Sequence, residues 1–143
     1  MKTMNEKGFT LTELLIVIAI IGIIGTFVGS NIIGNFNKAK VDSTKIQMRN
    51  IGNALKDYYR DCGRFPLTNQ GLEALIQPQS DCKNYNPSGY LGENLKKVPE
   101  DGFGGPFMYS SDNGVKYEIR SLGQDKQEGG DGLAKDISSN DLD

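Results

Sequence analysis

The sequence contains no histidine and no tryptophan, and only two of its 143 residues are cysteine. Without histidine, the chain lacks the commonest general base and the commonest transition-metal ligand. No nucleophile paired with a base and no phosphate-binding glycine loop ahead of a helix is visible. A net charge of −2 argues against nucleic acid as a partner. We therefore expect a protein that is not an enzyme and does not bind nucleic acid.

Charged side chains are missing from residues 14–37, although they make up 24% of the whole chain. Most of this stretch is Ile, Leu, Val, Ala or Gly, and Lys2 and Lys7 precede it. As a helix, such a run is long enough to cross a hydrocarbon core of about 30 Å. We therefore predict one membrane-spanning helix with the N-terminus in the cytoplasm and the polar remainder outside. A cleaved secretory signal and a plain one-pass anchor are the alternatives.

Glu13 lies near the start of this apolar segment, where a carboxylate is costly and by default marks a functional site. Neither alternative accounts for it. If a peptidase cuts between Gly8 and Phe9, the new α-amino group is a cation close to Glu13. In a fibre of staggered subunits, the amine of one copy can pair with Glu13 of its neighbour in a low-dielectric setting. Glu13 would then set the register of assembly.

The string GFTLTELLIVIAIIG, from Gly8 to Gly22, resembles the class III signal of type IV pilins and type II secretion pseudopilins. This resemblance implies that prepilin peptidase cleaves between Gly8 and Phe9 and methylates the new Phe9 amine. It also implies that Glu13 guides docking onto the growing filament. That family often carries proline where Ser30 stands. The residues that could loosen the helix here are Gly25, Gly29 and Gly34.

After residue 37 the pattern predicts an amphipathic continuation of the helix to about Asp61, with Gly63 and Pro66 ending it. The expected apolar face consists of Ile46, Ile51, Leu55, Tyr58 and Cys62. Thr68 or Asn69 is expected to cap a short second helix that Pro78 ends. The two cysteines, Cys62 and Cys82, are predicted to form a disulfide if the head lies outside the cytoplasm, and would be two thiols in a reducing compartment.

Two antiparallel strands are predicted near residues 107–110 and 115–121, because Asp112-Asn113-Gly114 between two alternating runs is typical of a hairpin. A third short strand is expected before or after them. The side chains expected near the long helix are Phe107, Tyr109, Tyr117 and Ile119. The fold class is therefore α+β. We divide the chain into a leader (1–8), a transmembrane or filament-core helix (9–37) and a head (38–143).

The C-terminal segment is rich in glycine and acidic residues and has few apolar side chains to bury. Its acids include Asp125, Glu128, Asp131 and Asp136. They are compatible with a disordered acidic tail and equally with a loop that binds a hard cation such as calcium, which accepts carboxylate and carbonyl oxygens. The spacing does not match an EF-hand loop, and composition leaves both interpretations open.

Three further strings resemble motifs of major type II secretion pseudopilins: RFPLTNQGLEALIQP, VPEDGFGGPFMY and YEIRSLGQDKQEGGDGLAKDI. The resemblance implies a type IV pilin-like fold whose final loop binds calcium. Carried over by position, the ligands would be main-chain oxygens of Leu122 and Gln127 and carboxylates of Asp125 and Asp136, with Asp131 or Ser138 completing the shell. The sequence departs from the motifs at Val98, Gly102, Phe103 and Lys126, where Leu, Pro, Trp and Gly are usual.

This second resemblance implies a structural subunit that polymerises into a periplasmic pseudopilus and drives or scaffolds the export of folded proteins. The implied partners are other copies of the chain, minor pseudopilins, the inner-membrane secretion platform, prepilin peptidase and, before assembly, membrane lipid. The subunit would cross the inner membrane once, with its head in the periplasm. The alternative is a type IV pilus major subunit serving adhesion, motility or DNA uptake. The early cysteines and the C-terminal Asp/Gly loop favour the pseudopilin.

Overall fold

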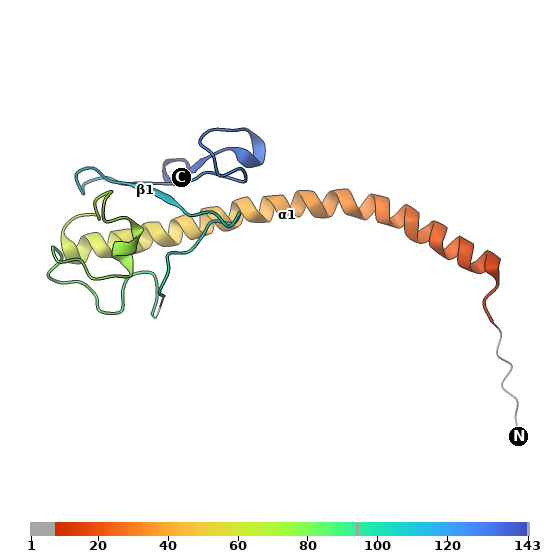
Figure 1. Ribbon diagram of the computed structural model, residues 1–143, viewed down its shortest axis with the longest axis horizontal. Coiled ribbons are helices and arrows are strands. Elements are labelled where there is room, and N and C mark those ends of the chain that lie inside the picture. The colour runs from red at the N-terminus through yellow and green to blue at the C-terminus, as the bar shows by residue number, and fades with distance from the viewer. Residues whose placement is uncertain (1–7, 94, 143) are drawn as a thin grey trace, which may run out of the picture. The chain divides into compact units, whose positions relative to one another are not determined.

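The computed structural model describes residues 8–93 and 95–142, and for residues 27–32 it describes the backbone alone. Apart from Gly8, the predicted leader lies outside the described residues. Along the chain (Figure 1) the elements are the helix α1 (Leu11–Cys62), the 3₁₀ helix η1 (Leu72–Leu75), the strands β1 (Met108–Ser110) and β2 (Glu118–Ser121), the 3₁₀ helix η2 (Gly132–Ala134), the strand β3 (Ile137–Ser138) and the 3₁₀ helix η3 (Ser139–Asp141). Two compact units meet between Asn37 and Lys38, and α1 contributes to both.

In the N-terminal unit, α1 carries apolar side chains that are at least half exposed. They are Leu11, Leu14, Leu15, Ile16, Ile18, Ile20, Ile21, Ile23, Ile24, Ile33 and Phe36. An apolar surface of this extent marks a site of interaction with protein or lipid. In the part of the chain whose side chains are described, no helix is both long enough and apolar enough to cross a membrane.

In the head, α1 buries one face that repeats every three or four residues. Its buried members are Thr44, Met48, Ile51, Leu55 and Tyr58. The prediction that Ile46 belongs to this face is wrong, because Ile46 is 56% exposed. Two residues before Met48, it lies more than half a turn away from the buried face. The helix ends as predicted: Gly63 adopts a φ of +77° and donates its N–H to the Tyr59 carbonyl at 2.7 Å.

The 3₁₀ helix η1 buries Leu72, Ala74 and Leu75 in the same core. The prediction of a Thr68 or Asn69 cap is wrong, because the N-cap is Gly71 and no side chain caps this helix. Thr68 instead contacts the hairpin, where its hydroxyl oxygen accepts the Ser111 N–H at 2.9 Å. Thr68, although threonine favours helix caps, here joins two loops that are distant in sequence.

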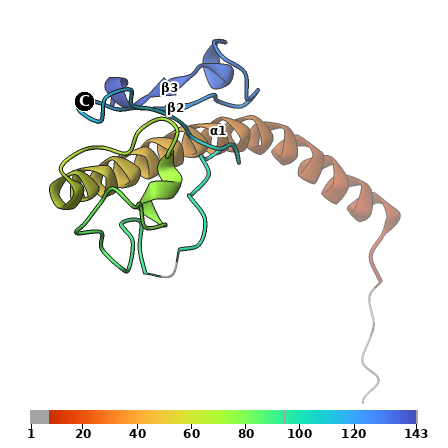
Figure 2. The ribbon, with the colours of Figure 1, turned by 60° about the vertical axis from the view of Figure 1, so that its left-hand side comes forward.

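The three strands form an antiparallel sheet in the order β1-β2-β3. Figure 2 shows β2 and β3 on one side of the second half of α1, with η1 on another. Phe107 and Ile119 join the core as predicted. The second strand begins at Glu118 rather than at Val115, since side chains form the hydrogen bonds of backbone groups in the connection before it. Ser111 donates its O–H to the Lys116 carbonyl and the Asn113 side chain accepts the Val115 N–H.

Tyr109 and its neighbours form an aromatic cluster between the sheet and the end of α1. The half-buried Tyr109 donates its O–H to the Pro66 carbonyl at 2.7 Å. Burial raises the pKa of Tyr109 to about 12, so the phenol stays neutral and keeps this hydrogen bond at physiological pH. Phe65 packs against Tyr59 and Tyr117 with ring centroids 4.7 Å apart in both pairs. These contacts join β1 to the segment that follows α1.

Cys62 and Cys82 form a disulfide with their Cα atoms 4.8 Å apart and a sequence separation of 20. The bridge joins the last residue of α1 to the loop after η1. Arg64 and Asp81, which lie close in sequence to the two cysteines, form an ion pair.

Replacing both cysteines by serine should lower the free energy of unfolding by about 3 kcal/mol in the chain-entropy model. Urea unfolding of the head (38–143) measures this. Wild-type protein should become less stable in reductant, whereas the double variant should not respond; equal midpoints for both proteins would contradict the prediction.

Candidate functional site

The first candidate site is the start of α1, where Thr10 and Glu13 cap the helix reciprocally. The Glu13 carboxylate accepts the Thr10 N–H at 2.9 Å and the Thr10 O–H at 3.0 Å. The Glu13 N–H donates to the Thr10 hydroxyl oxygen at 3.2 Å. This is a capping box. Our reading of the sequence missed the role of Thr10, although the pattern Thr-x-x-Glu before an apolar run indicates it.

The peptide bond expected to be cut lies just outside this cap. Gly8 and Phe9 precede the first residue of α1, and Phe9 is 84% exposed. Among the described residues, a Cβ built on Gly8 would have no atom within 4 Å. These observations are compatible with the predicted cleavage. The pairing of a free Phe9 amine with Glu13 of another copy stays a prediction.

The second candidate site is the loop between β2 and β3, which contains the predicted calcium ligands. Hydrogen bonds across the loop hold its two sides together, among them Gln124 N–H to the Leu133 carbonyl at 2.9 Å. Positive φ angles at several glycines let the backbone bend back on itself. These glycines are Gly123, Gly129, Gly130 and Gly132. The loop is thus an ordered part of the head rather than a disordered tail.

Asp136 has one carboxylate oxygen in use and one without a partner. Its Oδ2 accepts the Gly129 N–H at 3.2 Å, while its Oδ1 is buried and has no hydrogen-bond partner among the described residues. A buried carboxylate oxygen left unpaired is costly, so an observed one requires an explanation. A cation bound in the loop would supply the missing partner. The orphaned oxygen of Asp136 therefore fits the predicted role as a ligand.

The other predicted ligands are placed differently. Asp125 accepts the Gln127 N–H at 3.1 Å and is exposed, as is Asp131. Ser138 donates its O–H to Glu118 at 2.9 Å and accepts the Asn140 N–H. Among the described residues, no three acidic, cysteine or histidine side chains are grouped so as to hold a metal. Carboxylates and main-chain carbonyls nevertheless form a donor set that suits calcium, and ion binding would have to gather them.

Lys126, which stands where the resembling motif usually has glycine, has a φ of +57°. The left-handed conformation is costly for a residue with a side chain, which explains the usual glycine. Here the lysine compensates with a contact: its Nζ donates to the Gly104 carbonyl at 3.0 Å. The departure from the motif therefore adds a tether between the loop and the turn at residues 101–105.

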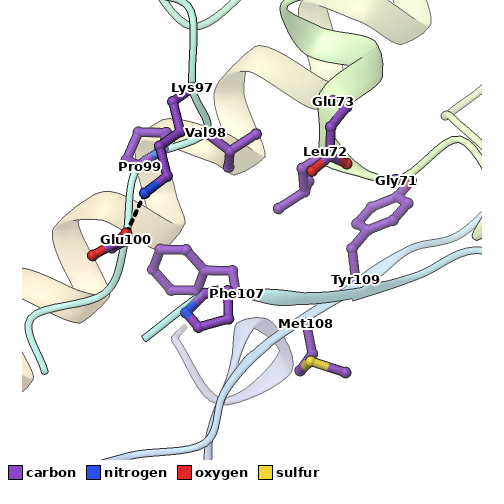
Figure 3. Close-up of a pocket in the computed structure, with 11 residues that line it drawn as sticks. Gly71, Leu72, Glu73, Lys97, Val98, Pro99, Glu100, Phe107, Met108 and Tyr109 are labelled. Carbon is purple, nitrogen blue, oxygen red and sulfur yellow. Dashed lines mark hydrogen bonds and ion pairs between the residues drawn. The ribbon is translucent and has the colours of Figure 1, made fainter. Parts of the chain in front are cut away.

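A pocket of about 440 Å³ lies elsewhere on the head, beside η1 and β1. Figure 3 shows Leu72, Val98 and Phe107 around its interior, and the charged groups of its lining are Glu73, Lys97 and Glu100. Lys97 and Glu100 form an ion pair at 2.5 Å, which lowers the pKa of the Glu100 carboxyl. The amino-acid sequence alone indicates no function for the charged groups of this pocket.

The chain matches models of known protein families. The model "Type II secretion system (T2SS), protein G" matches residues 31–140, and "Prokaryotic N-terminal methylation motif" matches residues 3–29. The chain is 38% identical to type II secretion system core protein G of Vibrio cholerae, covering 96% of this chain and 94% of that one. It is 37% identical to the protein of the same name from Pseudomonas aeruginosa, covering 97% and 98%.

A solved structure is similar as well. The crystal structure of the major pseudopilin from the type 2 secretion system of enterohaemorrhagic Escherichia coli matches with a TM-score of 0.60 and 27% identity. The match covers 76% of this chain and 93% of that chain. The long helix, the three-stranded sheet and the methylation motif thus define a pilin-like subunit.

Within that class, the chain belongs to the type II secretion system protein G family. Its function is that of a major pseudopilin, a subunit that polymerises into the pseudopilus of type II secretion. Between the two functions expected from the sequence, these matches favour the pseudopilin over the type IV pilus subunit. Family members are structural subunits, which agrees with the expectation of a protein without catalytic function.

Proposed function

We propose that residues 9–37 lie in the inner membrane before assembly, with the head (38–143) in the periplasm. The observation that carries this proposal is the match of residues 3–29 to the N-terminal methylation motif. The absence of charge from residues 14–37 and the exposed apolar side chains of α1 support it. On assembly the same apolar surface passes from lipid to the helices of neighbouring copies. The resulting periplasmic filament drives or scaffolds the export of folded proteins.

Prepilin peptidase removes residues 1–8 in this proposal and methylates the Phe9 amine. The cut places a cation beside the Glu13 carboxylate of a neighbouring copy, and the pair sets the register of the filament. Minor pseudopilins and the inner-membrane secretion platform are the further partners. The exposure of Phe9 and the position of Gly8 outside the helix support access for the enzyme.

Calcium, in the same proposal, binds the loop between β2 and β3. Asp125 and Asp136 would supply carboxylates, and Leu122 and Gln127 main-chain oxygens, with Asp131 completing the shell. The ion would neutralise carboxylates that otherwise repel one another and would give Asp136 Oδ1 its partner. The chain's own residues set the backbone path through the glycines and the Gln124–Leu133 hydrogen bond.

Intact-mass analysis of the chain coexpressed with prepilin peptidase tests the processing step. The expected product has lost residues 1–8 and gained one methyl group on the amine of Phe9. A Gly8→Leu variant is the matched control and should remain full length. Because position 8 is exposed, misfolding of this variant would not explain a loss of cleavage. A full-length, unmethylated wild-type chain in the presence of active enzyme would contradict the proposal.

A further inference from the structure

The turn at residues 101–105 is fixed by one buried carboxylate, that of Asp101, which is 7% exposed. Its Oδ1 accepts the N–H groups of Phe103 at 2.9 Å and Gly105 at 2.8 Å. Its Oδ2 accepts the O–H of Ser121 at 2.5 Å. A buried carboxylate with three hydrogen bonds is held in one orientation. The turn and the last residue of β2 are therefore joined through Asp101.

The turn is in addition pressed against α1, which fixes it to the head. The Gly102 N–H donates to the hydroxyl oxygen of the fully buried Thr44 at 3.0 Å. A Cβ at Gly102 would lie 2.1 Å from the Lys40 carbonyl oxygen, so only glycine allows this approach. Asp101 is thus fixed in position, and its hydrogen bond fixes the Ser121 side chain in turn.

Ser121 passes this restraint on to the peptide that follows it. Its hydroxyl oxygen, which donates its proton to Asp101, also accepts the Gly123 N–H at 3.3 Å. Because a peptide unit is planar and trans, the Gly123 N–H and the Leu122 carbonyl lie in one plane and point in opposite directions. Fixing the N–H therefore fixes the direction of the Leu122 carbonyl, which is the proposed main-chain calcium ligand nearest to β2.

The far side of the same peptide is also confined. A Cβ at Gly123, whose φ is +65°, would lie 2.8 Å from the Leu133 carbonyl oxygen, so the two sides of the loop are in close contact there. Lys126 adds the second tether to the turn through Gly104. The segment 122–126 is thus held at both ends by residues 101–105.

We propose that Asp101 and Ser121 are positioning residues for the calcium loop, which orient the Leu122 carbonyl before the ion binds. The proposal rests on the calcium site proposed above. Preorganisation lowers the ordering that binding would otherwise require, so it raises the affinity for the ion. Neither residue touches the ion. Both act through the Leu122–Gly123 peptide.

The test compares Ser121→Ala with Ser111→Ala in the full-length chain in detergent micelles. Both serines are buried and each donates one short hydrogen bond, at 2.5 Å and 2.7 Å, but only Ser121 contacts the loop. Calorimetric titration with calcium chloride should give a dissociation constant raised about tenfold for Ser121→Ala, the equivalent of one hydrogen bond to a charged group. Ser111→Ala should bind as the wild type does.

Amide hydrogen exchange in chelator supplies a readout that needs no ion. Residues 122–126 should exchange faster in Ser121→Ala and at the wild-type rate in Ser111→Ala. Wild-type affinity and exchange in Ser121→Ala would overturn the proposal, as would equal losses in both variants. If the wild-type chain binds no calcium, the calcium site fails. The exchange rates then still decide whether Ser121 holds the Leu122–Gly123 peptide.

Discussion

Replacing Glu13 by glutamine should abolish most filament assembly while leaving the start of α1 intact. Glutamine keeps an oxygen that can accept the Thr10 N–H and O–H, so the capping box survives. The negative charge is lost, and with it the proposed partner of the Phe9 amine. Because breaking an ion pair in a low-dielectric contact costs several kcal/mol, the yield of sheared filaments should fall by roughly tenfold or more.

The variant Thr10→Ala tests the contribution of the helix cap while the charge of Glu13 is kept. It removes the hydroxyl that bonds Glu13 but keeps the carboxylate, and losing such a cap costs about 1 kcal/mol. Filament yield should fall less than in Glu13→Gln. Both variants should be cut between Gly8 and Phe9, as shown by intact mass. If Glu13→Gln assembles normally, or if Thr10→Ala is the worse of the two, Glu13 acts as a helix cap and not as a register charge.

Calcium should stabilise the isolated head, and Asp125→Ala should remove that effect. The head (38–143) is a compact unit that contains the core, the disulfide and the loop, so it can be studied alone. At a calcium concentration about a hundredfold above the dissociation constant, binding should raise the free energy of unfolding by about 2.7 kcal/mol. For a domain of this size, this corresponds to a rise of roughly 10 °C in melting temperature. Thermal melts with calcium and with chelator measure the shift.

Asp112→Ala is the matched control for Asp125→Ala. It also removes one exposed aspartate, but from the connection between β1 and β2, outside the proposed calcium loop. The control should keep the full calcium shift, and Asp125→Ala should lose it while melting near the wild-type temperature in chelator. A wild-type head that melts at the same temperature in both conditions would refute the calcium site. A shift retained by Asp125→Ala would exclude that residue as a ligand.

The features that sequence predicted well depend on local chemistry. The end of α1 was predictable because Gly63 is a left-handed stop followed by Pro66. The hairpin and the aromatic face of the sheet followed from alternation, and residues Phe107 and Ile119 are buried accordingly. The capping box was equally local and could have been found, since Thr10 and Glu13 are three residues apart in a recognised pattern.

Other features required tertiary structure. Ile46 is more apolar than Thr44, yet Thr44 is buried because it bonds Lys40 and the turn at Gly102. No pattern along the chain connects Asp101 with Ser121, whose side chains meet across 20 residues. For the calcium loop, sequence resemblance named the ligand types, but the orphaned oxygen of Asp136 appears only in three dimensions.

Among the residues whose side chains are described, the buried ones begin at Thr44 in the head. In the proposed assembly, the first half of α1 passes from lipid to the helices of neighbouring copies, and both surroundings are apolar. No large gain in hydrophobic free energy therefore accompanies the move. Growth of the fibre would then be nearly isoenergetic for the apolar part, which leaves the proposed pair between Glu13 and the Phe9 amine to favour the assembled state.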